Sequence, residues 1–273
     1  MGGQGRRPRG RRAGGGPTPP PRGVRALERA EFEATYRLED GHWWFVGMRR
    51  VTASLLASLP GAGRWGRLLD VGCGTGGNLL LLSRYAAQVV GLDVSPTALD
   101  LCRSRGPWPL VLGSADALPF ADASFDALAT FDVLCQLPPG ADLVALGEFR
   151  RVLRPGGALV VRVPAYQWLW SDHDRVLRTH HRYAAGELRR KLQRAGFRVV
   201  RLTYANTFLF PVAAARRLLQ RAGVGSGRTD LVPVPGPVNA ACLGLMGLEA
   251  ALLRAVSLPF GLSVMAVAVR EEV

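Results

Sequence analysis

Short apolar runs separated by glycine-rich or polar stretches recur along the middle of the chain. The runs are short enough to be buried strands, and they lie at residues 68–71, 88–92, 107–112, 127–131, 158–163 and 197–204. Segments with helical spacing lie between them, at residues 79–85, 95–103, 141–153 and 186–195. Strands that alternate with helices predict an α/β domain built on a largely parallel sheet.

The first of these strands runs into a glycine-rich turn that opens the next helix. Residues 68–78 read Leu-Leu-Asp-Val-Gly-Cys-Gly-Thr-Gly-Gly-Asn. Glycines remove side chains where the backbone approaches a ligand, and the free N–H groups at the helix start face that ligand. The second strand ends in Asp93, seventeen residues after Gly76, and a carboxylate at this spacing can accept both hydroxyls of a ribose. Together these features predict a nucleotide-binding βαβ unit.

Two further motifs follow in order along the chain. Asp116 comes after the third strand, and Leu153-Arg154-Pro155-Gly156-Gly157 leads into the fifth. With Asp70-Val71-Gly72-Cys73-Gly74-Thr75-Gly76 and Asp93, this set resembles the class I S-adenosylmethionine-dependent methyltransferases over roughly residues 64–206. An NAD-binding Rossmann domain, or a fold that has lost its cofactor, is the alternative interpretation.

The resemblance implies a Rossmann-like sheet of seven strands, the last antiparallel, that binds S-adenosyl-L-methionine. It implies that the glycine loop holds the methionine part of the cofactor, Asp93 the ribose and Asp116 the adenine amine. The residues that it assigns to cofactor binding are Asp70, Gly72, Cys73, Gly74, Gly76, Asn78, Asp93, Val94, Asp116, Ala117 and Phe131.

Two segments precede this core of residues 64–206. Residues 1–23 consist mainly of glycine, proline and arginine, a composition that predicts a disordered tail. Residues 24–63 have helical spacing around His42-Trp43-Trp44-Phe45, and this element resembles one in a bacterial, type 11-like subgroup of these methyltransferases. Its expected roles are a lid over the cofactor or acceptor, with Arg49 or Arg50 facing an anion, and a packing anchor, and the two are compatible.

The connection from the sixth strand to the last one is too long for a hairpin loop. Residues 207–258 are therefore predicted to form a helical insertion, and residues 259–273 to add the final strand of the core. The insertion either caps the acceptor site or only packs on the core. A basic edge of Arg216, Arg217 and Arg221 beside Leu218 and Leu219 also predicts a peripheral membrane contact.

Three of the four histidines lie at residues 173–181, beyond the fifth strand. The side chains there that could act as a base are Tyr166, Asp172, His173, Asp174 and Tyr183. His173 is the first choice because imidazole titrates nearest to neutral pH. In the same subgroup a Ser-x-His-Asp segment and an Arg-Tyr pair occur here, matched by Ser171, His173, Asp174, Arg182 and Tyr183. One hypothesis places His173 and Tyr183 over the transferred methyl group, and the other makes the segment a polar surface loop with a structural Tyr183.

Composition and charge indicate which classes of partner the protein can bind. The net charge is +14, and half of it comes from the arginines of residues 1–25, which contain no acid. Such a charge attracts nucleic acid or anionic lipid without specificity, and no specific nucleic acid is predicted because no separate RNA-binding domain is visible. The four cysteines, Cys73, Cys102, Cys135 and Cys242, lack metal-ligand spacing, so no metal site is predicted and a reducing cytoplasm is expected.

The sequence thus predicts a cytoplasmic methyltransferase, with the inner membrane face as a peripheral site. Its acceptor is expected to be a small molecule or a lipid-linked or saccharide compound. RNA or protein methylation, and a non-catalytic module that only binds the cofactor, are the alternatives. The methylated atom and the oligomeric state stay open.

Overall fold

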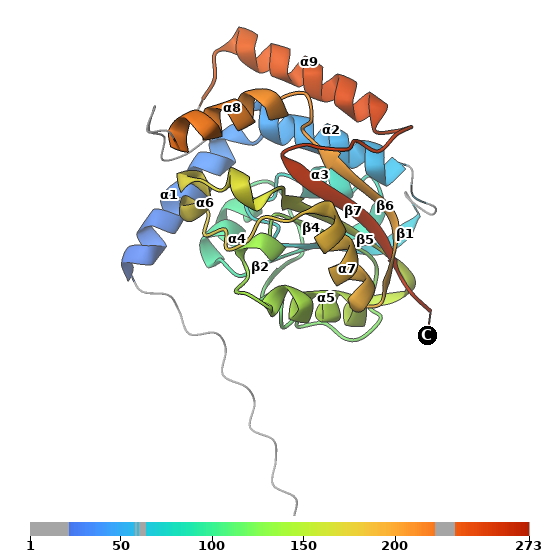
Figure 1. The fold of residues 1–273 in the computed structure, drawn as a ribbon. Helices are drawn as coiled ribbons and strands as arrows, with labels where there is room; N and C mark the ends of the chain where they lie inside the picture. Colours follow the sequence, from blue (N-terminus) through green and yellow to red (C-terminus); the bar gives the residue numbers. More distant parts are fainter. Residues whose placement is uncertain (1–21, 58, 60–63, 222–232, 273) are drawn as a thin grey trace, which may run out of the picture.

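A seven-stranded sheet forms the centre of the protein in the computed structural model, which describes residues 22–57, 59, 64–221 and 233–272 (Figure 1). The strands are β1 (Trp65–Val71), β2 (Ala86–Asp93), β3 (Leu110–Leu112), β4 (Phe125–Phe131), β5 (Leu153–Pro164), β6 (Phe197–Ala205) and β7 (Ser263–Arg270). Their order is β3-β2-β1-β4-β5-β7-β6, and β7 runs antiparallel to both of its neighbours. The predicted fold, with its antiparallel last strand, is confirmed.

The register of the parallel strands decides where ligands can bind. Asp70 pairs with Gly91 of β2 and with Ala129 of β4, so β1, β2 and β4 end at the same edge. Ligands of open α/β sheets bind outside this carboxyl edge. The glycine turn after β1, Asp93 at the end of β2 and Phe131 at the end of β4 therefore meet in one place.

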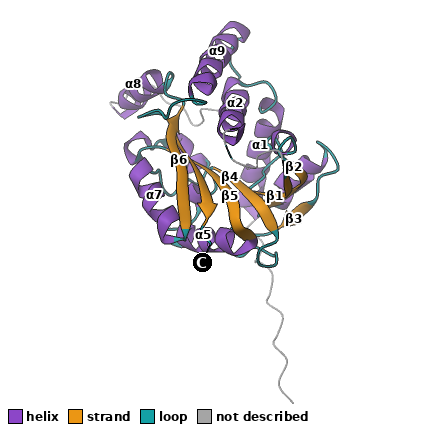
Figure 2. Cartoon of the chain, turned by 90° about the vertical axis from the view of Figure 1, so that its right-hand side faces the viewer, coloured by secondary structure: helices purple, strands orange, loops and turns teal. Residues whose placement is uncertain are grey.

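Helices cover both faces of the sheet. They are α1 (Arg22–Leu38), α2 (Trp43–Ala57), α3 (Leu79–Leu82), α4 (Pro96–Arg103), α5 (Ala141–Val152), α6 (Asp172–Val176), α7 (Ala185–Arg194), α8 (Phe210–Arg221) and α9 (Gly236–Leu252), with short 3-10 turns η1 (Leu134–Gln136) and η2 (Gln167–Leu169). Helices α5 and α7 lie on one face, where Phe149 and Leu192 are buried in its core, and α2 and α9 lie on the other (Figure 2). No helix in these described segments is long and apolar enough to cross a bilayer.

The sequence explains the tight geometry around the glycine turn. Gly72 and Gly76 have φ angles of 77° and 89°, which favour glycine. A Cβ at Gly72 would lie 2.1 Å from Cγ2 of Val133, and one at Gly76 would lie 2.6 Å from Sγ of Cys102. These glycines thus let the turn pack against its neighbours. The following helix, α3, is shorter than predicted because β2 already begins at Ala86 and the chain must reverse first.

The N-terminal segment is more helical than predicted. The aromatic element forms the first turn of α2, which begins at Trp43, and α1 already begins at Arg22. The predicted disorder of the tail concerns residues 1–21, which lie outside the described residues, and Arg22 and Gly23, which belong to α1.

The inserted helix α9 packs on α2, as the outermost layer over this face of the sheet (Figure 1). Met246 is buried against Gly47, where an added Cβ would lie 2.7 Å from Cγ of Met246. Asn239 of α9 accepts a hydrogen bond from the backbone N–H of Trp43 at 2.7 Å and donates one to the carbonyl of Gly41 at 2.9 Å. The insertion and the N-terminal helices therefore form one unit.

Glu249 of α9 links the insertion to the end of β6 through hydrogen bonds. Its carboxylate is fully buried and accepts hydrogen bonds from the backbone N–H groups of Asn206, Thr207 and Phe208, the last two at 2.7 and 3.3 Å. Burial raises the pKa of Glu249 above its usual value, and these N–H donors lower it. The only charge on α9 is therefore turned inward.

Candidate active site

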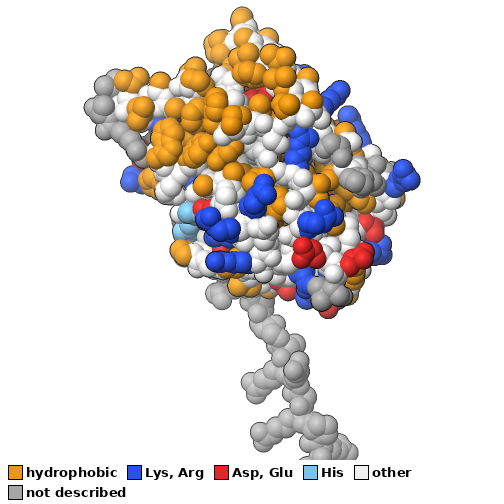
Figure 3. Space-filling model, turned by 45° about the vertical axis from the view of Figure 1, so that its right-hand side comes forward, with side chains coloured by type: hydrophobic (Ala, Val, Ile, Leu, Met, Phe, Trp, Pro, Cys, Tyr) orange, Lys and Arg blue, Asp and Glu red, His pale blue; other side chains and the backbone are white. Residues whose placement is uncertain are grey.

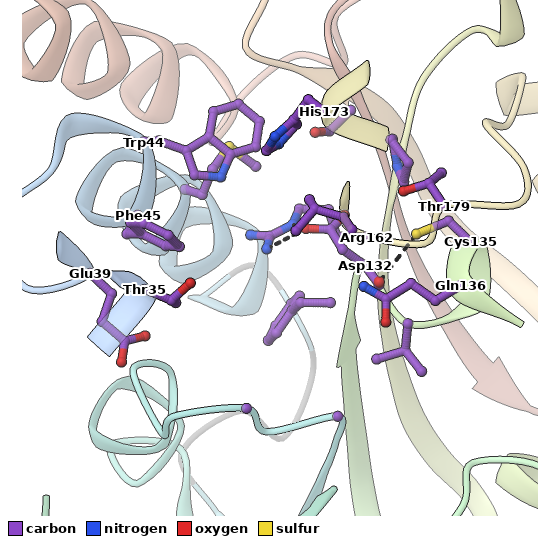
Figure 4. Close-up of a pocket in the computed structure, with 18 of the residues that line it drawn as sticks. Thr35, Glu39, Trp44, Phe45, Asp132, Cys135, Gln136, Arg162, His173 and Thr179 are labelled. Carbon is purple, nitrogen blue, oxygen red and sulfur yellow. Dashed lines mark hydrogen bonds and ion pairs between the residues drawn. The ribbon is translucent and has the colours of Figure 1, made fainter. Parts of the chain in front are cut away.

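A cavity of about 900 Å³ opens at the carboxyl edge of the sheet. The glycine turn and the ends of β2, β4 and β5 form one side, and α1, α2, α6, α8 and α9 contribute the rest. Figure 4 shows Trp44 and His173 in the upper part of the view, Phe45 of α2 to the left and Thr179 to the right. The insertion and the aromatic N-terminal element thus reach the same cavity as the glycine turn.

The structure brings most of the predicted cofactor residues to this cavity. Those that line it are Gly72, Cys73, Gly74, Asn78, Asp93, Val94 and Phe131. Those that do not are Asp70, Gly76, Asp116 and Ala117.

Asp93 lies where the second strand meets the glycine turn. Its Oδ2 accepts a hydrogen bond from the N–H of Gly74 at 2.8 Å, and its Oδ1 accepts one from the N–H of Ser95 at 2.9 Å. The carboxylate is buried yet lines the cavity. Asp93 therefore fixes the turn and also offers its charge to a ligand.

Asp116 and Ala117 do not line the cavity in this structure, so their assignment to the cofactor stays a prediction. The chain turns sharply after β3, and the N–H of Ala117 bonds to the carbonyl of Ser114 at 3.2 Å. The Asp116 carboxylate accepts a hydrogen bond from the hydroxyl of Ser114. Ser114 and Ala115 line the cavity in their place.

Asp70 and Gly74 test whether the site suits the predicted cofactor. Both carboxylate oxygens of Asp70 are buried and lack a hydrogen-bond partner among the described residues. Burial and the nearby Asp93 raise the pKa of Asp70 to about 7, against an opposite effect of Arg162. A Cβ built on Gly74 would meet nothing within 4 Å, so open space lies beside the turn. An orphaned acid and an open glycine turn fit a ligand with a cationic amino group, as S-adenosylmethionine has.

An ion-pair cluster that the sequence did not reveal holds the N-terminal helices on the glycine turn. Glu39 is buried, accepts a hydrogen bond from the hydroxyl of Thr75 and pairs with Arg105 at 2.7 Å. Arg105 also donates to the carbonyl of Thr75 at 2.8 Å and to Asp40 at 2.8 Å. Burial raises the pKa of Glu39, with opposite effects from Thr75 and Arg105. The position of the N-terminal helices is thus coupled to the conformation of the turn.

A second unforeseen pair crosses the cavity wall between β4 and β5. Arg162 pairs with Asp132 at 2.7 Å and lies over the Phe131 ring, 5.1 Å from its centroid (Figure 4). Asp132 has a φ angle of 60°, which is uncommon outside glycine, and its carbonyl accepts a hydrogen bond from the thiol of Cys135 at 3.1 Å. This pair places a charged group beside the predicted cofactor residue Phe131.

The aromatic element lies both at the cavity and against the core, and its roles as lid and as anchor stay predictions. His42, Trp43, Trp44 and Phe45 all line the cavity, and the two tryptophans also pack against the core under α2. Of the two arginines, Arg49 lines the cavity and donates to the carbonyl of Glu39 at 2.5 Å. Arg50 instead donates to the carbonyl of Leu243 in α9, so it does not face a ligand.

His173 and Tyr183, the two predicted catalytic residues, lie in different environments. His173 is on α6 and lines the cavity. Tyr183 is 1% exposed, and its hydroxyl donates to Asp142 at 2.9 Å and to the carbonyl of Leu134 at 3.2 Å. Burial and the nearby Asp142 raise the pKa of Tyr183 far above its usual value. Tyr183 is thus buried away from the cavity, which contradicts a place over the reacting atoms and agrees with the alternative of a structural tyrosine.

The remaining candidate bases are engaged elsewhere. Asp174 lines the cavity but forms a two-point ion pair with buried Arg182, at 2.8 and 3.0 Å. Asp172 pairs with Arg175 at the surface, and Tyr166 stacks on Tyr204 with ring centroids 5.2 Å apart. His173 lines the cavity and therefore stays the first candidate for the base.

This fold and site define a class I S-adenosylmethionine-dependent methyltransferase. Residues 69–161 match a family described as "Methyltransferase domain". The chain is 34% identical over 155 residues to an uncharacterized methyltransferase of Synechocystis, and the match covers 54% of this chain and 71% of that protein. The chain therefore belongs to this methyltransferase family.

Two further comparisons show how far the likeness extends. A demethylmenaquinone methyltransferase of Tropheryma whipplei is 35% identical over 144 residues, which cover 50% of this chain and 54% of that protein. The match thus spans about half the length of that relative. A solved complex of the Haloferax volcanii Trm112 methyltransferase activator with a methyltransferase shares the fold, with a TM-score of 0.60 and 22% identity over 92% of this chain and 98% of that one.

The position of Asp93 leads to a prediction on cofactor affinity. Asp93→Ala removes the carboxylate from the cavity and leaves the N–H of Gly74 without its acceptor. We expect binding of S-adenosylmethionine to weaken by about 1.5–3 kcal/mol, the scale for hydrogen bonds to a charged group. Titration calorimetry measures the change, with Asp100→Ala, an exposed acid of α4, as the matched control. Equal affinities for the two variants would remove Asp93 from the cofactor site.

Proposed function

We propose that the protein transfers the methyl group of S-adenosylmethionine to a small, largely apolar acceptor bound in this cavity. The cofactor, when bound, supplies a methyl group on a sulfonium centre that an electron-rich atom can take up. The residues proposed to hold it are Gly72, Gly74, Asn78 and Asp93, with Asp70 behind the turn. The protein's own task is then to align the acceptor and to exclude water.

This proposal rests on one observation: one part of the cavity wall is polar and another part is apolar. Backbone and carboxylate groups of the glycine turn and β2 line one part. Aromatic and aliphatic side chains from α2, α6 and α8 line another, among them Trp44, Phe45, Val176, Leu209 and Val212. A cavity of about 900 Å³ that combines an apolar wall with polar and charged groups fits a small-molecule site.

The position of His173 supports a role as general base. Its side chain lines the cavity, and Figure 4 shows it in the upper part of the view with Trp44. An acceptor hydroxyl would lose its proton to such a base during methyl transfer, whereas a neutral amine needs none. The demethylmenaquinone relative is named for a quinone acceptor. This name agrees with the apolar wall but does not extend to the acceptor here.

A labelling experiment tests the proposed acceptor class. The full chain is incubated with bacterial cell extract and S-adenosylmethionine that carries a tritiated methyl group. Label should enter compounds that an organic solvent extracts, and the Asp93→Ala protein should transfer much less of it. Label in RNA or in protein would replace the proposal by one of the two macromolecular alternatives. Cofactor binding without any transfer would favour the non-catalytic module.

A further inference from the structure

We propose that the outer faces of α8 and α9 dock on the surface of an anionic lipid bilayer. The proposal extends the proposed function, because the membrane would then deliver the apolar acceptor to the cavity. It concerns a surface contact, in which the helices lie in the interface with their apolar side chains among the lipids.

The outer face of α9 carries no charged side chain. Its single charged residue, Glu249, is fully buried against the backbone N–H groups at the end of β6. The exposed positions of the helix are occupied by glycine, proline, alanine, valine and leucine, and Leu245 and Leu248 are 39% and 52% exposed. Surface helices of water-soluble domains normally present charged or polar residues on their outer side. We therefore expect this face to contact an apolar environment rather than water.

The apolar surface continues from α9 over α8 and the loops beside it. Its large exposed members outside α9 are Trp168, Phe208, Leu218, Leu219, Val256 and Phe260. Figure 3 shows hydrophobic side chains gathered over the upper part of the molecule, where Figure 1 places α8 and α9. Contiguous apolar surface of this kind marks a site of contact with a partner or a membrane.

The charges around this surface match an anionic membrane. Arg216 of α8 and Arg254 after α9 are exposed. Among residues 206–221 and 233–260, the two parts of the insertion region that the structure describes, Glu249 is the only acid, and it is buried. Anionic headgroups attract arginines that flank an inserted apolar face. If two copies of the chain met through this face, their arginines would lie close together. This region offers no exposed acid to pair with them, so like charges would repel.

The same two helices also line the cavity. Its walls include Leu209 just before α8, Val212 and Ala213 in the first turn of α8, and Val238 and Cys242 of α9. A bilayer that contacts the outer faces of these helices would therefore lie next to the cavity. An apolar acceptor could pass from lipid to the site with little exposure to water.

Vesicle flotation of the full chain tests this proposal without any methyl transfer. The protein is mixed with vesicles of phosphatidylcholine alone or with about 30% phosphatidylglycerol. We expect flotation with the anionic vesicles, less with the neutral ones, and a reduction at about 1 M salt because charges are then screened beyond about 3 Å. Failure to float would overturn the membrane proposal and leave the proposed function standing.

Matched variants separate this face from other basic surfaces. Leu245→Glu with Leu248→Glu adds charge to the outer face of α9, and neither residue lines the cavity. Val144→Glu is the control, since Val144 is 56% exposed on α5, on the opposite side of the sheet. We expect the double variant to lose at least about tenfold in vesicle partitioning, from lost apolar burial, and the control to keep it. Both should keep the melting temperature and the affinity for S-adenosylmethionine.

Two results would overturn the assignment. Flotation of the double variant equal to that of the wild type would show that other parts of the chain, such as the arginines of residues 1–25, carry the lipid binding. Analytical ultracentrifugation gives the second: a dimeric wild type that does not float, together with a monomeric double variant, would make this face a dimer interface.

Discussion

Asp174→Ala is expected to lower the free energy of unfolding by about 3–5 kcal/mol, the cost of breaking a buried ion pair from one side. Asp174 and Arg182 are both buried, and two hydrogen bonds of 2.8 and 3.0 Å join them. Asp174 also accepts a hydrogen bond from the N–H of Ser171 at 2.8 Å and so caps α6. Its loss would leave the guanidinium of Arg182 buried with only the carbonyl of Ala165, at 3.2 Å, as a hydrogen-bond acceptor in the structure described. Urea denaturation measures the change.

The neighbouring Asp172 provides a matched control in the same helix. Its carboxylate pairs with Arg175 at 3.0 Å, but both side chains are more than half exposed. Exposed pairs contribute about 0–1 kcal/mol, so Asp172→Ala should change the unfolding free energy little. Similar small losses for the two variants would show that water reaches Arg182 and that the pair is not a structural anchor of α6. The ion pair of Asp174 and Arg182 anchors α6, the helix that carries His173.

The local motifs of the core could be predicted because their geometry is set by residues near in sequence. The glycine turn needs positive φ angles and close packing at positions 72 and 76. Glycine meets both requirements, so the residue types alone predict the turn. Asp93 ends an apolar strand, and parallel register then brings it to the turn. Ser95 and Pro96 mark the start of α4, where the Ser95 hydroxyl accepts a hydrogen bond from the N–H of Ala98 at 3.4 Å.

The charged groups of the cavity could not be predicted in the same way, because their partners are distant in sequence. Glu39 meets Arg105 only after α1 has packed beside α4, and Arg162 meets Asp132 only across the β4–β5 pair. Nothing in the local sequence around an arginine indicates which acid it will face. An arginine inside the apolar run of β5, at Arg162, was the one local signal available, since a buried charge requires a partner.

Tyr183 shows how a functional-looking cluster can mislead. It follows two histidines and an arginine, and this polar neighbourhood favoured an active-site role. The backbone, however, forms a bridge between Tyr183 and Ala165 beyond the end of β5, and this register turns the ring into the core. There its hydroxyl finds Asp142, which also pairs with Lys191. All of these residues can be read from the sequence, but the pairing of Tyr183 with Ala165 that brings them together cannot.

His173→Ala is expected to lower the turnover of the acceptor found by labelling by about 10²–10⁴, the usual contribution of a general base. The affinity for S-adenosylmethionine should stay close to that of the wild type, because the predicted cofactor residues lie on the glycine turn, β2 and β4 rather than on α6. Single-turnover rates at saturating acceptor measure the chemical step, and calorimetry measures cofactor binding. The wild-type rate should fall as the pH drops and the imidazole is protonated, whereas the variant should lose this limb of the profile.

His180→Ala is the matched control for this variant, since His180 belongs to the same segment but is exposed and does not line the cavity. It should keep wild-type turnover and the wild-type pH profile. Added imidazole should restore part of the rate of His173→Ala, because free imidazole can enter the space that the side chain vacates and accept the proton. A loss of activity from altered structure alone would not be restored in this way. An unchanged rate in His173→Ala would instead mean that the acceptor reacts without a base, as a neutral amine does, and that His173 only shapes the wall beside Trp44.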